Sequence, residues 1–339
     1  MTHQPEPLLP GVLAIDAGNS KTDVALIGVD GSILGSARGG GFAPQKIGGA
    51  AAVAGLAPLV EQAAAAAGHP TWTGVLTSHV SACLANADLP VEEEALRVAL
   101  ESHPWGAGNT VVNDTFGLLR AGTDGPRGVA VVCGAGINCV GLLPDGRTAR
   151  FPALGELTGD WGGGSGLAVA SMWHAVRSED GRGGPTALAR AIAEHFGLPT
   201  AGEVAEAVHL GHLPNARLHE ITRVLFAVAD EGDEVALELV DRQADEIVRL
   251  AVVALGRLGL LDTPTPVVLG GGVIASRHPL LLDNLTARLA AAAPLAEPRV
   301  VVAPPVLGAA LLGLDHLGAG ARAQARVREA YETGRPLAA

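Results

Sequence analysis

The chain has 339 residues, which at about 100–200 residues per domain predicts two domains. Apolar residues make up 48% of it and charged residues 17%, so we expect a large core and exclude wholesale disorder. The net charge is −12, no basic block is present, and there are only 5 Phe, 4 Trp and 1 Tyr. Binding to nucleic acid or to an anionic membrane surface is therefore not expected, because it needs clustered cations or stacking rings.

The composition also bears on the compartment. Cys83, Cys133 and Cys139 have no zinc-type spacing, and an odd number of thiols suits a reducing interior. The first ten residues have no basic start or long apolar run, so no signal peptide is predicted. Apolar stretches at 128–144 and 300–314 are interrupted by Gly, Asn or Pro, which disfavours a membrane span. We expect a soluble, cytoplasmic protein.

In chain order, the first third predicts the succession β-β-β-α-β-α-β-α. The Asp30-Gly31 pair between two apolar runs predicts a hairpin between the second and third strands. An alanine-rich helix is predicted over about 46–67, and another begins near Glu92–Glu94. The strands are predicted at Val12–Asp16, Thr22–Val29, Ile33–Ala37, Thr73–Ser78 and Thr110–Asn113.

From Gly128 the same layout begins again, about 117 residues later, which indicates a duplicated domain. Strands are predicted at Val129–Cys133, Asn138–Leu143, Thr148–Phe151, Pro266–Leu269 and Arg299–Ala303. Helices are predicted at about 165–178, 186–196, 202–208, 216–229 and 233–258. We expect an N-terminal domain over 8–122, a C-terminal domain with helical insertions over 123–318, and a C-terminal helix and tail over 319–339.

Polar or glycine-rich turns follow several strands. Asp16–Thr22 offers a carboxylate, a glycine turn, hydroxyls and an ammonium group, which could hold phosphate and Mg²⁺ or form an ordinary hairpin. Cys133–Asn138 carries two glycines at the matching point of the second half, either a tight turn or a phosphate turn. Asp114, after a strand and before a helix, could be a helix cap or an exposed base.

Two further glycine-rich segments also have two possible roles each. In Leu157–Ser165, Asp160 could orient a polyhydroxy ligand or cap the following helix. Val267–Val273 runs through three glycines and could be a nucleotide platform or a tight strand–helix junction. His209 and His212 lack an acidic companion, so they are interpreted as surface residues.

Together, these turns resemble the duplicated actin–hexokinase fold, and more narrowly the N-acetylglucosamine kinase branch of the BadF/BadG/BcrA/BcrD ATPase family. The resemblance runs from about Val12 to Gly313. It implies an α/β protein with duplicated ribonuclease H-like (actin-like ATPase) domains. Each would have a mixed five-stranded sheet flanked by helices, with the active site in the interdomain cleft.

The resemblance also assigns roles. Asp114, following Asn113, would be the catalytic base, and Asp16 would hold Mg²⁺ through water. Sugar contacts would come from Gln45, Asn113, Asp114, Asn138 and Asp160. ATP contacts would come from Gly18, Asn19, Ser20, Lys21, Thr22, Gly134, Ala135, Gly136, Gly271 and Gly272. In two places the chain departs from the family pattern: Trp161 stands where family kinases have Glu, and Gln45 lies where animal enzymes use Asn.

The implied function is an ATP-dependent kinase of N-acetylglucosamine or a close N-acetylhexosamine, acting at the 6-hydroxyl. Its partners would be the amino sugar, ATP with Mg²⁺ and a second copy in a homodimer, with no nucleic acid or membrane. Alternatives are a glucosamine kinase, an ATPase activator of a CoA-thioester dehydratase, and a non-catalytic sugar- or nucleotide-binding protein. A sugar-responsive repressor is disfavoured because only about ten residues precede the first strand.

Overall fold

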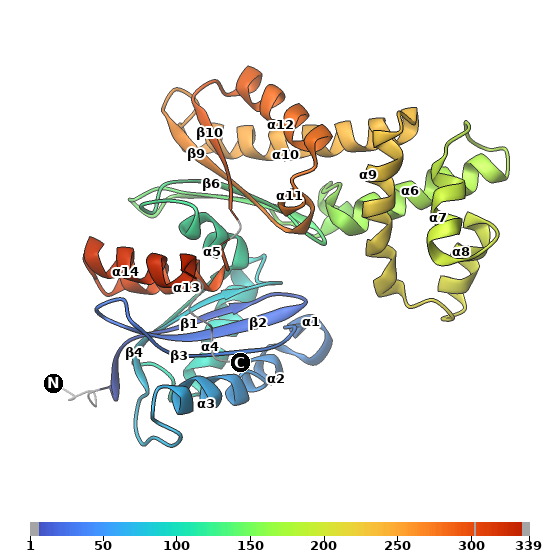
Figure 1. Cartoon of the computed structure of the whole chain (residues 1–339). Helices are drawn as coiled ribbons and strands as arrows, with labels where there is room; N and C mark the ends of the chain where they lie inside the picture. Colours follow the sequence, from blue (N-terminus) through green and yellow to red (C-terminus); the bar gives the residue numbers. More distant parts are fainter. Residues whose placement is uncertain (1–6, 302, 334–339) are drawn as a thin grey trace. The chain divides into compact units, whose positions relative to one another are not determined.

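The structure is a computed structural model that describes residues 7–301 and 303–333 (Figure 1). The described residues form two compact units: unit 1 combines residues 7–126 with 301 and 303–333, and unit 2 comprises residues 127–300. The expected boundary near 122 is close to the observed one, whereas segment 301–318, expected in the second domain, belongs to unit 1. Its helix has apolar partners on the first sheet, which the order of elements along the chain does not reveal.

Unit 1 is built on a mixed five-stranded sheet in the order β3-β2-β1-β4-β5. The first three strands form an antiparallel meander, and β4 and β5 run parallel to β1. The strands are β1 (Leu9–Ala17), β2 (Lys21–Gly28), β3 (Ile33–Gly40), β4 (Thr77–Leu84) and β5 (Asn109–Asn113). The predicted β4 at Thr73–Ser78 lies too early, because the run that pairs with β1 continues to Leu84.

Alternating side chains on β1 direct two apolar layers to opposite faces of this sheet. Leu13 and Ile15 pack with the helices α2, α3 and α4, while Val12 and Ala14 pack with α13 and α14 (Figure 1). The helices are α1 (Pro44–Ile47), α2 (Gly49–Ala54), α3 (Ala57–Ala66), α4 (Pro90–Glu101), α5 (Asp114–Ala121), α13 (Val306–His316) and α14 (Ala321–Glu332). The single helix predicted over 46–67 is thus three helices, interrupted at Gly48, whose φ is 86°, and at Gly55–Leu56.

Unit 2 repeats this sheet in the order β10-β9-β6-β7-β8. The strands β6, β7 and β8 form an antiparallel meander, and β9 and β10 run parallel to β6. The strands are β6 (Gly128–Cys133), β7 (Ile137–Leu142), β8 (Thr148–Arg150), β9 (Thr265–Gly270) and β10 (Ala296–Val300). The predicted duplication and the two mixed sheets are confirmed, although the last strand ends at Val300 and not at Ala303.

Helices of unit 2 share one core with its sheet, from Val129 and Val131 of β6 to Leu285 of α12. They are α6 (Gly163–Glu179), α7 (Leu188–Phe196), α8 (Ala201–His209), α9 (Ile221–Asp230), α10 (Glu234–Leu258), α11 (Gly272–Ala275) and α12 (Pro279–Ala292). Two short 3-10 helices precede α6 and α9: η1 (Gly155–Thr158) and η2 (Asn215–Glu220). The helix predicted over 216–229 therefore begins as η2 and continues as α9.

Among the described residues, the helical stretch Gly49–Ala66 alone has the length and apolarity of a membrane-crossing helix. It comprises α2 and α3, and the side chains of Val53, Val60 and Ala63 are buried in the core of unit 1. Core helices commonly meet the same criteria, so this stretch is explained by the packing of unit 1.

Candidate functional site

Two carboxylates lie at the ends of parallel strands in unit 1, on either side of β4. Asp16 lies near the end of β1, where it is 5% exposed, and Asp114 follows β5 as the first residue of α5. Burial, together with the negative charges of Asp114 and Asp23, raises the pKa of Asp16 to about 8. Burial also raises the pKa of Asp114 to about 6. Buried acids with raised pKa values are typical of groups that exchange protons or bind cations.

Asp114 does not cap its helix. The N-cap of α5 is Asn113, whose Oδ1 accepts a hydrogen bond from the backbone N–H of Thr115 at 3.0 Å. Its Nδ2 donates to Asp88 at 2.8 Å, and its backbone N–H donates to Glu93 at 3.0 Å. The cap interpretation of Asp114 is therefore wrong, and the carboxamide predicted to contact sugar at Asn113 is engaged in holding the β5–α5 junction.

Sequence reasoning missed a further carboxylate, the buried Asp23, which faces Asp16 across the β1–β2 pairing. Arg38 on β3 balances its charge: Nε lies 2.5 Å from Oδ1, and Nη2 lies 3.0 Å from Oδ2. The hydroxyl of Thr22, one residue earlier, is buried without a hydrogen-bond partner in the structure. The sequence did not reveal that Asp23 is buried, because a single carboxylate in a strand of alternating residues is usually interpreted as facing solvent. Its partner Arg38 lies on a different strand, β3.

The predicted phosphate turn of unit 1 is a tight β1–β2 connection. The backbone N–H of Gly18 donates to the carbonyl of Lys21 at 2.9 Å, while Asn19 and Ser20 are exposed at the tip. Its backbone is fixed from the side, because the N–H of Phe42 donates to the carbonyl of Gly18 at 2.9 Å. The loop after β3, which carries the predicted sugar residue Gln45, thus lies against the turn.

Asn86 joins these pieces and was not singled out from the sequence. It adopts a left-handed conformation with φ of 63°, and its Nδ2 donates to Asn19 Oδ1 at 2.9 Å and to the Phe42 carbonyl at 3.3 Å. Its own carbonyl accepts from Gln45 Nε2 at 3.4 Å. The one available signal was an Asn two residues after an apolar strand, since Asn is among the few residues that tolerate positive φ.

In unit 2, the turn Gly134–Asn138 is joined by hydrogen bonds to the loop that precedes α6. The N–H of Gly134 donates to the Gly136 carbonyl at 2.9 Å, while Gly164 N–H donates to the Gly134 carbonyl at 2.7 Å. Ser165 N–H donates to the Ala135 carbonyl at 2.9 Å. Asn138, on β7, is partly buried, and its Oδ1 accepts from the N–H of Cys139 at 2.7 Å. The two glycine-rich segments predicted separately therefore form one structure.

At two positions of this structure, the neighbouring backbone leaves no room for a side chain, so the residue is glycine. Gly163 has φ of 69°, and a Cβ there would lie 2.5 Å from the Gly136 carbonyl group. Gly271 has φ of 91°, and a Cβ there would lie 2.4 Å from the carbonyl carbon of Cys133. Backbone contact at this distance excludes a side chain. The junction after β9 thus packs tightly on the turn after β6, which leaves the predicted nucleotide role of Gly271 and Gly272 untested.

Asp160 lies between η1 and α6, where its Oδ2 accepts a hydrogen bond from Thr158 Oγ1 at 2.6 Å. It does not cap α6: the N-cap residue is Gly162, without a side-chain hydrogen bond. The backbone N–H of Gly163 instead donates to Oε1 of the buried Gln243 at 2.8 Å. The cap interpretation of Asp160 is therefore wrong.

A cavity of about 560 Å³ lies beside Asp160, entirely within unit 2; we call it the α6 pocket. It is lined by Ala135, Gly136, Gly155, Glu156, Asp160, Trp161, Gly162, Ser165, Gly166, Val169, Ala170, Trp173, His174, Leu239 and Arg242. Ala135, Gly136 and Asp160 are thus placed at the same cavity. Trp161, which departs from the family pattern, belongs to it as well, with the guanidinium of Arg242 over its ring at 4.1 Å from the centroid.

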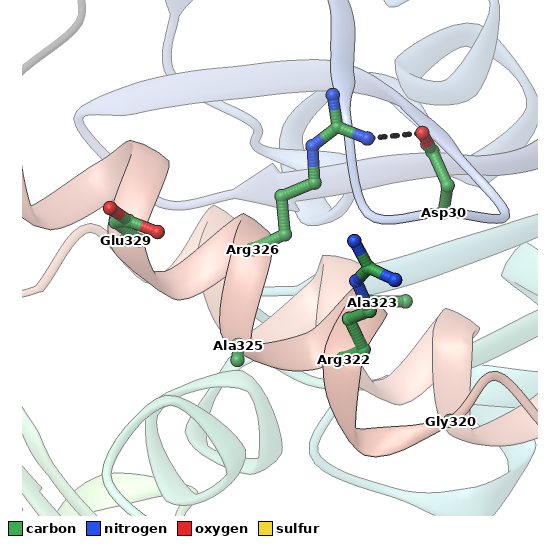
Figure 2. A pocket seen from close by; sticks show the side chains of 7 residues that line it. All are labelled: Asp30, Gly320, Arg322, Ala323, Ala325, Arg326 and Glu329. Atoms are coloured by element: carbon green, nitrogen blue, oxygen red, sulfur yellow. Dashed lines mark hydrogen bonds and ion pairs between the residues drawn. The ribbon is translucent and has the colours of Figure 1, made fainter.

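Unit 1 has a larger hollow of about 740 Å³ along α14, shown in Figure 2. Arg326 reaches from α14 to form an ion pair with Asp30 in the β2–β3 turn, and Arg322, Ala323, Ala325 and Glu329 also line it. None of the predicted site residues lines this hollow. We therefore regard it as a surface feature where the hairpin meets the helix.

The three cysteines are buried in β4, β6 and β7, and burial raises the pKa of each thiol. Within residues 7–301 and 303–333, no three His, Cys, Asp or Glu side chains form a metal-binding group. Cys133 and Cys139 thus belong to the apolar core of unit 2, as expected from their sequence context.

Comparison with known proteins supports the fold and the family. The chain is 27% identical over 212 residues to N-acetyl-D-glucosamine kinase of Dictyostelium discoideum, covering 61% of this chain and 65% of that protein. It is 25% identical over 190 residues to N-acetylmuramic acid/N-acetylglucosamine kinase of Clostridium acetobutylicum, covering 56% and 62%. The matches thus span less than two thirds of each relative.

Among solved structures, a candidate N-acetylglucosamine kinase from Chromobacterium violaceum superposes with a TM-score of 0.71 at 21% identity. The superposition covers 91% of this chain and all of that one, which shows a common fold. A family model matches residues 13–313, nearly the entire chain. The protein belongs to the BadF/BadG/BcrA/BcrD ATPase family.

Proposed function

We propose that this protein is an ATP-dependent amino-sugar kinase that phosphorylates N-acetylglucosamine or a close N-acetylhexosamine at its 6-hydroxyl. The observation that carries the proposal is the pair of carboxylates at the ends of parallel strands, the buried Asp16 and the partly buried Asp114, both with raised pKa values. Membership of an ATPase family and two relatives named for N-acetylglucosamine support it.

In this proposal Asp114 is the catalytic base. Phosphoryl transfer needs a group that orients the acceptor hydroxyl and accepts its proton as the new O–P bond forms. A carboxylate with a pKa of about 6 is ionised in a large fraction of molecules at neutral pH, yet is more basic than an exposed aspartate. The γ-phosphoryl group of ATP passes to the sugar oxygen, and ADP leaves.

The residues of unit 1 also fit a magnesium site. Mg²⁺ is usually held by one or two carboxylates together with substrate phosphates and water, not by a full protein cage. Asp16 offers such a carboxylate, and the exposed Asn19, Ser20 and Lys21 surround the turn after it. When bound, Mg²⁺ would neutralise charge on the β- and γ-phosphates. Gly18 and Thr22 complete the proposed phosphate turn.

Unit 2 would supply backbone N–H groups and sugar contacts. We assign phosphate contacts to the backbone N–H groups of the exposed Ala135 and Gly136. Gly134, also predicted to contact phosphate, shapes this turn, because its N–H donates to the Gly136 carbonyl. Asn138 and Asp160 offer short polar side chains for hydroxyl or acetamido groups. Asn113 acts here as a positioning residue, because its carboxamide fixes the helix that begins with Asp114.

The test is an ADP-release screen with MgATP over N-acetylglucosamine, N-acetylmannosamine, N-acetylmuramic acid, glucosamine and glucose. We expect the highest kcat/KM with an N-acetylhexosamine, no turnover in EDTA, and no ADP release with the matched 6-deoxy sugar. Preference for glucosamine or glucose would correct the acceptor. ATP hydrolysis that no sugar stimulates would overturn the kinase proposal.

A further inference from the structure

The α6 pocket extends well beyond Asp160. Ser165, Val169 and Trp173 line it at four-residue spacing along α6, so they lie on one face of the helix. At 1.5 Å rise per residue, the eight steps from Ser165 to Trp173 span about 12 Å. That distance is long enough for two linked pyranose rings.

The far end of the pocket carries an exposed aromatic surface. Trp173 is 54% exposed, and Val169, one turn earlier, is 59% exposed. The guanidinium of Arg177 lies over the Trp173 ring at 4.4 Å from its centroid, and the ring of His174 meets it edge-on at 4.7 Å. These contacts restrain the indole, so a ligand that stacks on it loses little conformational entropy of the side chain.

The other end of the pocket, near Asp160, is polar. Asp160, fixed by Thr158, and Glu156 present carboxylates beside the exposed backbone of Gly136. At this end Arg242 lies over Trp161, which fixes a second indole and adds donors. Carbohydrates match both ends, because a pyranose has hydroxyls around its edge and C–H groups on its faces. The cavity volume of about 560 Å³ also falls in the range of about 300–1,000 Å³ typical of small-molecule sites.

We infer that the α6 pocket is an extended carbohydrate subsite, so that the acceptor is an amino-sugar glycoside with at least one further pyranose ring. The hexosamine ring lies near Asp160, and the second ring stacks on Trp173. This inference rests on the proposed kinase function for the identity of the first ring. The stacking itself requires only that the pocket binds sugar.

The test compares N-acetylglucosamine with its β-1,4-linked dimer, N,N′-diacetylchitobiose, as phosphoryl acceptors and as ligands without ATP. Trp173→Ala removes the proposed platform, and alanine preserves the helix. We expect the parent to use the disaccharide with the higher kcat/KM, and the variant to lose about tenfold in the disaccharide-to-monosaccharide ratio. Trp173→Phe should restore most of that ratio.

The matched control is Leu157→Ala, which removes a side chain that is 92% exposed near the pocket but does not line it. This variant should leave both substrates unaffected. Phosphorylation of the monosaccharide without binding of the disaccharide would overturn the subsite and leave the proposed function standing. Trp173-dependent disaccharide binding measured by calorimetry, without phosphorylation of any sugar, would support the subsite and overturn the proposed function.

Discussion

The two sheets have the same strand order but end in different chemistry. In unit 1, β1 ends in Asp16-Ala17 and β5 is followed by Asp114, so carboxyl groups lie where the parallel strands end. In unit 2, the equivalent β6 ends in Cys133 and is followed by Gly134-Ala135-Gly136, and β9 runs into Gly270–Gly272. One topology thus presents side-chain carboxylates in one copy and closely packed backbone in the other.

The difference shows that two copies of one fold can keep the same core and carry different residues at the ends of their strands. Strand pairing and core packing use the alternating apolar positions, which both copies retain. The residues just beyond the strand ends contribute little to that core, so they can differ without loss of the fold. Unit 1 is expected to be sensitive to loss of its carboxylates, and unit 2 to a side chain at Gly163 or Gly271, where the backbone packs closely on the turn after β6.

The largest expected effect comes from Asp114→Asn in unit 1. The substitution keeps the shape of the side chain but removes the proton acceptor, and general-base catalysis is worth about 10²–10⁴-fold. We expect kcat to fall at least about 100-fold, with sugar and ATP binding close to those of the parent. Steady-state kinetics with calorimetry measures both.

Folding provides the control, because Asn113 and not Asp114 caps α5. The unfolding midpoint of Asp114→Asn should be no lower than that of the parent. A variant with near-parent kcat would show that Asp114 is not the catalytic base. Unit 1 would then not be the copy that supplies the catalytic carboxylate.

The corresponding change in unit 2 is Gly271→Ala. Its Cβ would overlap the Cys133 carbonyl group, and φ of 91° disfavours a side chain. We expect a loss of about 2–4 kcal/mol in the free energy of unfolding, measured by urea denaturation. Gly136→Ala, whose Cβ would meet no atom within 4 Å, is the control and should change stability by less than about 0.5 kcal/mol. Equal stability of the two variants would contradict the tight β9 junction.

Asp160→Ala tests whether a side chain of unit 2 binds the sugar. Loss of a hydrogen bond to a charged group costs about 1.5–3 kcal/mol, so sugar affinity should fall by about 10- to 150-fold. Calorimetry without ATP measures this change. Since Asp160 does not cap α6, its removal should leave the helix intact. Thr158→Val, which removes the donor to Asp160, should reduce affinity less than Asp160→Ala does. Unchanged affinity in Asp160→Ala would leave no sugar role for this carboxylate.

The smallest effect concerns the pH dependence of stability in metal-free protein. The pKa of Asp16 is about 8 in the folded chain and near 3.8 when exposed, so the folded state retains its proton between these values. The unfolded state then binds fewer protons, and stability falls as pH rises from about 4 to about 8. Asp16→Asn should therefore be more stable than the parent at pH 8, by at least about 1 kcal/mol, and equal to it near pH 4.

Added Mg²⁺ sharpens this test. A cation that binds the folded state alone stabilises it, so Mg²⁺ should raise the unfolding midpoint of the parent more than that of Asp16→Asn. An identical response of the two proteins to Mg²⁺ would remove Asp16 from the magnesium site. Parallel pH profiles would show that Asp16 is not the buried proton carrier.

Local sequence determined the hairpins, the duplication and most strands, because alternation and turn residues act over short spans of chain; β4 and β10 were predicted with shifted bounds. It also placed Asp16 at the end of a strand and Asp114 and the glycine turns directly after strands. These features depend on neighbours a few residues away, which the linear chain displays.

Only the tertiary structure decided what these residues meet. It assigned α13 to unit 1 through Val12 and Ala14, and paired Asp23 with Arg38. It showed that Asn113 caps α5 and that Gln243 accepts a hydrogen bond from the first residue of α6. It also placed Trp161 and Trp173 at one cavity. Each of these outcomes depends on contacts between residues distant along the chain, and neither periodicity nor local propensity encodes which distant partner a side chain will find.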